Sequence, residues 1–271
     1  MGTGRLERHP VDLVGPLAFK LHSAGWAELG REWDWERYYL DRCEVNRIWR
    51  IESGRITVWS GTDQTVLSAG ETWFLPAGLP LRCACLSVSK FWVDFNAFAY
   101  ANEEILGFYR GKKPMRLRSM KWPDLKRDAR HLLASASALG QAAFGAVNAY
   151  LETHDQCLDA DRLAVFGKHQ ALIATIHQHL SIGLSIRELS AKSGMSDYYL
   201  SSLFKADMGM SIKKFVEHAV FKESARRLLK PEATVKAVAH GLGFQRESHF
   251  SRFFKKYGGV SPMFYRRKYS G

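Results

Sequence analysis

The spacing of apolar residues divides the chain into two parts. Between residues 45 and 95, apolar and polar positions alternate as they do in half-buried β-strands. From Asp124 onward, apolar residues recur every three or four positions, which is typical of amphipathic helices. Strands followed by helices predict an α+β protein with two domains.

The first part contains several short predicted strands. Residues 48–51 and 56–59 flank a polar segment containing Gly54, which predicts a hairpin. Residues 65–67 and 72–75 flank a second turn at Gly70. Short strands between turns rich in Gly and Pro indicate a sandwich or barrel. Further alternating positions are Leu81, Cys83, Cys85, Phe91, Val93 and Phe95.

Two helices are expected before residue 160, divided by Gly140. The first carries Leu125, Ala129, Leu132 and Leu133 on one face, and the second carries Phe144, Val147, Tyr150 and Leu151. The second stripe is expected to form a dimer interface, to pack against the strands, or to do both on different faces. A further helix is expected from about residue 163 to 180.

Capping residues define the helices that follow. Ser185 precedes Ile186, and Ser211 precedes a long helix predicted over 212–230, which Pro231 follows. Ser261 and Pro262 together are typical of a helix start.

The last ninety or so residues contain an internal repeat. Four positions recur 49 residues later, from Ile186, Leu189, Ser190 and Gly194 to Val235, Val238, Ala239 and Gly243. The offset then becomes 50, so the second copy has one inserted residue just after Phe244. At this offset, Leu200, Ser201, Phe204, Lys205, Ser211 and Phe215 match Phe250, Ser251, Phe254, Lys255, Ser261 and Tyr265. Each copy reads as helix, glycine turn and helix, which predicts two tandem helix-turn-helix units. Ser190, Ala191 and Ala239 are small enough for a close helix crossing.

Charge separates the same two parts. The net charge is +12, and residues 181–271 hold 17 basic and 7 acidic residues, against 22 and 20 in the other 180. A basic helix-turn-helix segment indicates a polyanionic partner, double-stranded DNA.

The second helix of each unit carries outward polar residues suited to reading base edges. Arg252 can pair with guanine and Glu247 can accept from cytosine, while serines contact bases or phosphates. The second unit is therefore expected to make the stronger base contacts. The outward positions are Asp197, Tyr198, Ser201, Ser202 and Lys205 in the first unit, and Arg246, Glu247, Ser248, His249, Ser251, Arg252, Lys255 and Lys256 in the second.

These residues resemble the signature of the AraC/XylS transcription regulators over roughly the last 100 positions. The first half of the match is Ile186, Leu189, Ser190, Gly194, Ser196, Tyr199, Leu200, Phe204, Lys205, Gly209 and Ser211. The second half is Gly243, Phe244, Ser248, Phe250, Ser251, Arg252, Phe254, Lys255, Gly259, Val260, Ser261, Pro262, Tyr265 and Arg266.

The resemblance implies that both second helices enter successive major-groove segments on one face of DNA. It places Tyr198, Ser201 and Ser202, and Glu247, Ser248, Ser251 and Arg252, at base-contacting positions. Arg246 departs from the family, which often has a capping Ser or Asp there, and Gln245 is the expected substitute cap. Family order further implies three parts: a cupin-like sensing barrel over 1–122, a helical dimerisation segment over 123–160 and a DNA-binding domain over 161–271. The expected partners are a second copy of the chain, a small-molecule effector and, for an activator, RNA polymerase.

The predicted barrel contains several tryptophans and arginines. Arg47, Trp49, Trp59 and Trp73 are the candidates for binding an acidic or sugar-like effector; alternatively, the tryptophans fill the core. Leu81 stands where many relatives have histidine, and no His-x-His-plus-Glu metal cluster occurs in this segment. We therefore expect no metal, no cofactor and no catalytic residues.

Cysteine use and hydropathy bear on where the protein acts. Cys43, Cys83, Cys85 and Cys157 do not stand at zinc-site spacing, so we expect reduced thiols in the cytoplasm. Residues 132–151 carry no Asp, Glu, Lys or Arg, but their Ser, Gly, Gln and Asn favour buried helices over a membrane span. The alternatives to a regulator are a cupin-type enzyme with an accessory helical domain and a non-specific architectural DNA binder.

Overall fold

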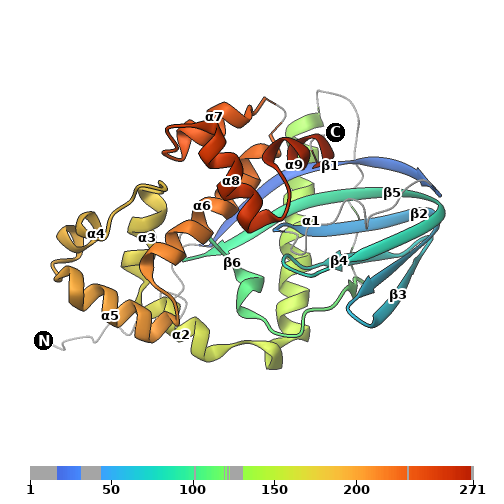
Figure 1. Cartoon of the computed structure of the whole chain (residues 1–271). Coiled ribbons are helices and arrows are strands. Elements are labelled where there is room, and N and C mark those ends of the chain that lie inside the picture. Colours follow the sequence, from blue (N-terminus) through green and yellow to red (C-terminus); the bar gives the residue numbers. More distant parts are fainter. Residues whose placement is uncertain are drawn as a thin grey trace, which may run out of the picture.

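The computed structural model describes residues 17–31, 44–100, 102–118, 120, 122, 131–230 and 232–269. One side of the molecule is a bent antiparallel sheet, and the C-terminal helices gather on the other (Figure 1). The strands are β1 Ala18–Gly30, β2 Asn46–Ser60, β3 Asp63–Ser68, β4 Thr72–Leu75, β5 Arg82–Ala99, β6 Glu103–Glu104 and β7 Met115–Arg116. The α-helices are α1 Leu132–Thr153, α2 Ala160–Lys168, α3 Gln170–Gln178, α4 Ile186–Ser193, α5 Asp197–Met208, α6 Ile212–Leu228, α7 Val235–Gly241, α8 Glu247–Gly258 and α9 Pro262–Tyr269. The described residues also include the short 3-10 helices η3 Ile105–Phe108 and η5 Asp155–Cys157.

The strands form one seven-stranded sheet in the order β1-β5-β2-β4-β7. β3 also pairs with β2, and β6 pairs with β5. The predicted sheet-then-helix order is thus confirmed. Within the described ranges, β1 and β7 end the hydrogen-bonded order and do not pair with each other. Closure into a cupin-like barrel, and the boundaries after residues 122 and 160, stay predictions.

The hairpin predicted around Gly54 is wrong, because β2 continues through it as one strand. β2 pairs with β4 before the bend and with β3 after it, while β5 follows β2 on its other edge. The register with β5 shifts on either side of Ser53 and Gly54, which marks a bulge. Gly54 has φ +74°, and an added Cβ would overlap the carbonyl oxygen of Ser87. Its glycine therefore serves a bend and a close backbone approach, not a chain reversal.

Helix α1 packs against one face of the sheet. Ile48 pairs in register with Phe74 and Val93, and these side chains share a core cluster with Val147 and Tyr150 of α1. The cluster explains why α1 runs unbroken through residue 140, where two helices were predicted: packing outweighs the roughly 1 kcal/mol cost of a helical glycine.

The stripe predicted on α1 is divided between two environments. Val147 and Tyr150 are buried on the sheet, which confirms packing for these two, whereas Phe144 is 48% exposed. Leu125 and Ala129 lie outside the described residues.

Among the helices that the structure describes, α1 alone is long and apolar enough by composition to cross a membrane.

The single helix predicted over 163–180 is two helices, α2 and α3. His169 separates them, with only 6% of its surface exposed, and its Nε2 lies 2.7 Å from Oδ2 of Asp207 in α5. The break therefore places a buried histidine against the first helix-turn-helix unit.

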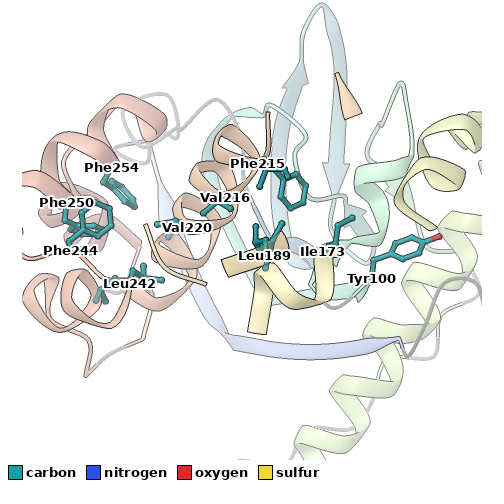
Figure 2. Close-up of a cluster of buried hydrophobic side chains, with 14 of the residues drawn as sticks. Tyr100, Ile173, Leu189, Phe215, Val216, Val220, Leu242, Phe244, Phe250 and Phe254 are labelled. Atoms are coloured by element: carbon teal, nitrogen blue, oxygen red, sulfur yellow. The ribbon is translucent and has the colours of Figure 1, made fainter. Parts of the chain in front are cut away.

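One apolar cluster runs from the sheet through the helices to the C-terminal unit. Figure 2 shows Tyr100 at one end, then Ile173 and Leu189, Phe215 and Val220 along α6, and the second-unit phenylalanines at the other end. The helical domain is thus packed onto the end of β5 and not merely tethered to it.

Candidate nucleic-acid interface

The first helix-turn-helix unit, α4 and α5, is built by local signals that the sequence shows. The Ser185 side chain accepts a hydrogen bond from the Glu188 amide, and the Glu188 carboxylate accepts one from the Ser185 amide, which together form a capping box. Gly194 ends α4 with φ +68°, and Ser196 caps α5 by accepting from the Tyr199 amide. The predicted helix, glycine turn and helix are confirmed.

The second unit, α7 and α8, repeats this plan with a longer turn. The start of α4 maps onto that of α7 at an offset of 49, and the start of α5 onto that of α8 at 50, which confirms the inserted residue. Thr234, which the sequence analysis missed, caps α7 by accepting from the Ala237 amide at 3.0 Å. Gly243 has φ +82°, as a turn of this kind requires.

Helix α8 begins without a side-chain cap. Arg246 is its N-cap residue and makes no capping hydrogen bond, so the substitution expected at Gln245 is not found. The first amides of α8 therefore keep their partial positive charge without a side-chain acceptor.

The interiors of both units are apolar, as predicted. Leu200 and Phe204 are buried in the first unit, and Phe250 and Phe254 in the second. Among the small residues, Ser190 and Ala239 are buried as expected, but Ala191 is exposed and does not line the helix crossing.

The outward side of α5 offers one large and several small groups. Tyr198 is 84% exposed, and Ser202 and Lys205 are also exposed. Ser201 is half-buried and its hydroxyl donates to the Asp197 carbonyl at 2.7 Å, which leaves only its lone pairs for a partner. The Asp197 carboxylate accepts from the Ser190 hydroxyl and so joins α5 to α4.

The outward side of α8 is larger and more basic. Ser251 is half-buried, and the exposed residues are Arg246, Glu247, Ser248, His249, Arg252, Lys255 and Lys256. Residues 248, 252 and 255 are spaced by four and three, so they share one face of the helix. Neither Arg252 nor Lys255 forms an ion pair with the described residues.

Helix α6 fixes the two units relative to each other. An added Cβ at Gly258 would lie 2.9 Å from the Phe221 ring, so α8 packs closely on α6. The Tyr257 hydroxyl also donates to Glu217 of α6. A second link joins the loop before α4 to the second unit, where the Ile182 amide donates to the Leu242 carbonyl at 2.9 Å.

The residues proposed for an effector are only partly brought together. Trp49 lies between Trp73 and Trp92 in directly paired positions of β4, β2 and β5, so the three rings share one face. Arg47, two positions before Trp49, lies on that face and pairs with Asp94 at 3.0 Å. Trp59 lies at the far end of β2, with the Arg82 guanidinium 4.4 Å from its ring centre.

Lys90 belongs to the same face, and the sequence analysis missed it. Its Nζ lies 3.4 Å from the Trp49 ring centre, and burial lowers its pKa to about 7. Burial also raises the pKa of the nearby Cys83 to about 12, so that thiol is protonated. Within the described residues, no group of three or more His, Cys, Asp or Glu could hold a metal ion.

Comparison with known proteins agrees with this geometry. A family described as a helix-turn-helix domain matches residues 189–268. The uncharacterised HTH-type transcriptional regulator YobQ of Bacillus subtilis is 36% identical over 96 residues, which span 35% of this chain and 40% of that protein. The raffinose operon regulatory protein RafR of Pediococcus pentosaceus is 26% identical over 216 residues, covering 75% of this chain and 77% of the relative.

A solved structure resembles nearly the whole chain in its fold. Wild-type ToxT of Vibrio cholerae, bound to an unsaturated fatty acid, has a TM-score of 0.51 at 13% identity and covers 93% of this chain and 96% of its own. The arrangement of a sheet-rich domain followed by two helix-turn-helix units is therefore shared.

Proposed function

We propose that this chain is a transcription regulator of the AraC/XylS family, and that α8 of its helix-turn-helix domain supplies the main sequence-reading contacts to DNA. The observation that carries the proposal is the exposed polar face of α8, with Arg252 and Lys255 unpaired within the described residues. Arg252 is assigned to guanine and Glu247 to cytosine. Tyr198, Ser201, Ser202 and Lys205 on α5 position the first unit more than they specify sequence. Arg246, Ser248, Ser251 and Lys255 complete the contact set.

Two substitutions on α8 separate base reading from phosphate binding. A duplex that the protein selects from a random pool serves as the specific probe, and an unselected duplex of equal length as the reference. Arg252→Ala should weaken binding to the selected duplex by about 1–3 kcal/mol and relax the preference at one base position. Lys255→Ala should weaken both duplexes alike and reduce the salt dependence by about one ion. Equal losses on both duplexes for both variants would remove α8 from the reading role.

The sheet domain is proposed to be cupin-like and to sense a small molecule. The face that carries Arg47 and Trp73 supports this, because an aromatic ring beside a guanidinium suits an acidic or sugar-like ligand. Trp49 on the same face is 1% exposed and fills the core, as the alternative expected. The fatty acid bound to ToxT is a further reason to expect an effector. The effector would act by changing how the DNA-binding units are presented.

The remaining partners follow from the same assignment. We propose that the chain forms a homodimer through α1 and acts in the cytoplasm. If it is an activator, RNA polymerase is a further proposed partner.

A further inference from the structure

One acidic side chain of the sheet domain reaches into the DNA-binding domain. Glu103 of β6 is buried, with 8% of its side chain exposed. Its Oε2 lies 3.3 Å from Nζ of Lys222 in α6, and its Oε1 lies 3.4 Å from Nε2 of His177 in α3. A charge-assisted contact therefore crosses from the sheet to the helix that joins the two helix-turn-helix units.

The Glu103 contact is charged in the folded protein. The Lys222 ammonium outweighs the effect of burial and holds the pKa of Glu103 at about 2. Glu103 in turn raises the pKa of Lys222. Because a buried charge that loses its partner is strongly disfavoured, α6 cannot move away from β6 without a large penalty.

The next residue points into the sheet domain. Glu104 accepts from Nδ2 of Asn46 at 2.9 Å and also from Nδ2 of Asn96. Asn96 Oδ1 lies 2.7 Å from His22, and Asn46 Oδ1 accepts from the Ala77 amide at 2.7 Å. Adjacent strand residues point to opposite sides, so β6 contacts α6 with one carboxylate and β1, β2 and β5 through the other.

The turn that leads into β6 is strained. Tyr100 is the one non-glycine with positive φ, 46°, among the described residues. Its ring packs against Phe108 and Phe166, and its hydroxyl donates to the Leu163 carbonyl of α2 at 3.3 Å. Helix α2 thus helps to hold a conformation that tyrosine disfavours, and such strain persists only where surrounding contacts enforce it.

A cavity of about 350 Å³ adjoins the same contact. Its lining includes Glu103 and Lys222, together with Phe166 and Met208. α6 is therefore not tightly packed on every side of Lys222, and the ion pair restrains it on this side, while the apolar cluster and the Arg226 guanidinium, 5.0 Å from the Phe98 ring centre, hold it elsewhere.

We propose that Glu103 is a positioning residue of the DNA-binding domain, which holds α6 through Lys222 and, with Glu104 on the same strand, couples the position of α6 to the interior of the sheet. The DNA-dependent part rests on the proposed function. The coupling is reciprocal, so DNA bound to α5 and α8 must alter the stability of the contacts around β6.

Hydrogen exchange on the full chain tests the coupling, with mass spectrometry of the segment over residues 98–108. Glu103→Gln and Lys222→Met each break the pair from one side. The matched control is Asp63→Asn, which removes the ion pair with Lys113 at 2.7 Å, where both side chains are more than half exposed. Without DNA, this segment should exchange about fivefold faster or more in Glu103→Gln and in Lys222→Met than in the wild type. The double variant should exchange no faster than either single variant. Asp63→Asn should match the wild type.

The second arm adds the duplex that wild-type protein selects from a random pool. Wild type should slow its exchange over residues 98–108, whereas Glu103→Gln should not, although peptides of α8 are protected in both. The proposal is overturned if free Glu103→Gln exchanges like Asp63→Asn, if DNA leaves this segment of the wild type unchanged, or if Glu103→Gln keeps the DNA effect. If no duplex is selected, the proposed function fails, and the free-protein arm still decides whether Glu103 positions α6.

Discussion

Single side chains on the two outward helices differ in how much of their bonding capacity remains for DNA. The Ser201 hydroxyl already donates within α5, whereas Arg252 is exposed and forms no ion pair with the described residues. Arg246 stands where a capping residue would satisfy the first amides of α8. The start of α8 therefore lacks a side-chain cap, which leaves its first amides available to a phosphate.

Adjacent carboxylates of β6 have opposite electrostatic environments, which gives a pH prediction. Burial raises the pKa of Glu104 to about 7, while ion pairing lowers that of Glu103 to about 2. The folded protein therefore keeps a proton on Glu104 at pH values above 4.5, the ordinary pKa of glutamate, where the unfolded chain releases it. Between these values the contribution of Glu104 to stability falls as pH rises, by up to about 1.4 kcal/mol per pH unit. The contribution of Glu103 is complete above pH 4.5 and is lost only as pH falls toward 2.

Glu104→Gln should remove the first of these dependences. Urea unfolding of wild type and variant is compared from about pH 5 to about pH 8, a range that spans the shifted pKa. The wild type should lose stability relative to the variant as pH rises through this range. Parallel stability curves would show that Glu104 titrates normally.

At the scale of elements, the sequence predicts the helices whose apolar positions recur in the repeat or whose ends carry capping residues. The two helix-turn-helix units and their outward faces follow from a repeat in which the same apolar positions recur. β1 escaped detection because a bulge between Leu21 and Ser23 interrupts its alternation. The residues around Gly54 look like a turn locally, and only pairing with β5 makes them a bulge. The Glu103–Lys222 contact joins positions 119 apart, so no local pattern indicates it.

The two turn glycines give a prediction at this scale. Gly194 faces open space, whereas an added Cβ at Gly243 would overlap the Ser181 hydroxyl. Gly194→Ala should cost about 1–2 kcal/mol, the penalty of a left-handed conformation. Gly243→Ala should cost about 1 kcal/mol more, from overpacking.

Chemical unfolding of the single variants and of the double variant Gly243→Ala with Ser181→Ala measures both the conformational cost and the overpacking cost. Removing the Ser181 hydroxyl should bring the cost of Gly243→Ala down to that of Gly194→Ala. If the double variant is no more stable than Gly243→Ala alone, the contact with Ser181 does not account for the difference.

At the scale of the whole molecule, the outer face of α1 is the proposed dimer surface. Leu133 is 84% exposed and Phe144 is 48% exposed on this helix. Leu133→Glu with Phe144→Glu should raise the dimer dissociation constant about tenfold or more, equivalent to roughly 1.4 kcal/mol. Sedimentation equilibrium measures this, with Leu86→Glu as the control, because Leu86 is equally apolar and 71% exposed on the sheet. A monomeric wild type would contradict the proposed dimer, and an equal effect of the control would place the interface elsewhere.

The central claim is that this chain reads DNA sequence through its tandem helix-turn-helix units. The most direct measurement is competition between the selected duplex and random duplex of equal length at one physiological salt concentration. The account predicts that the selected duplex binds about a thousandfold more tightly or better, as sequence-specific regulators do. A ratio near one would contradict the claim and would leave an architectural DNA binder.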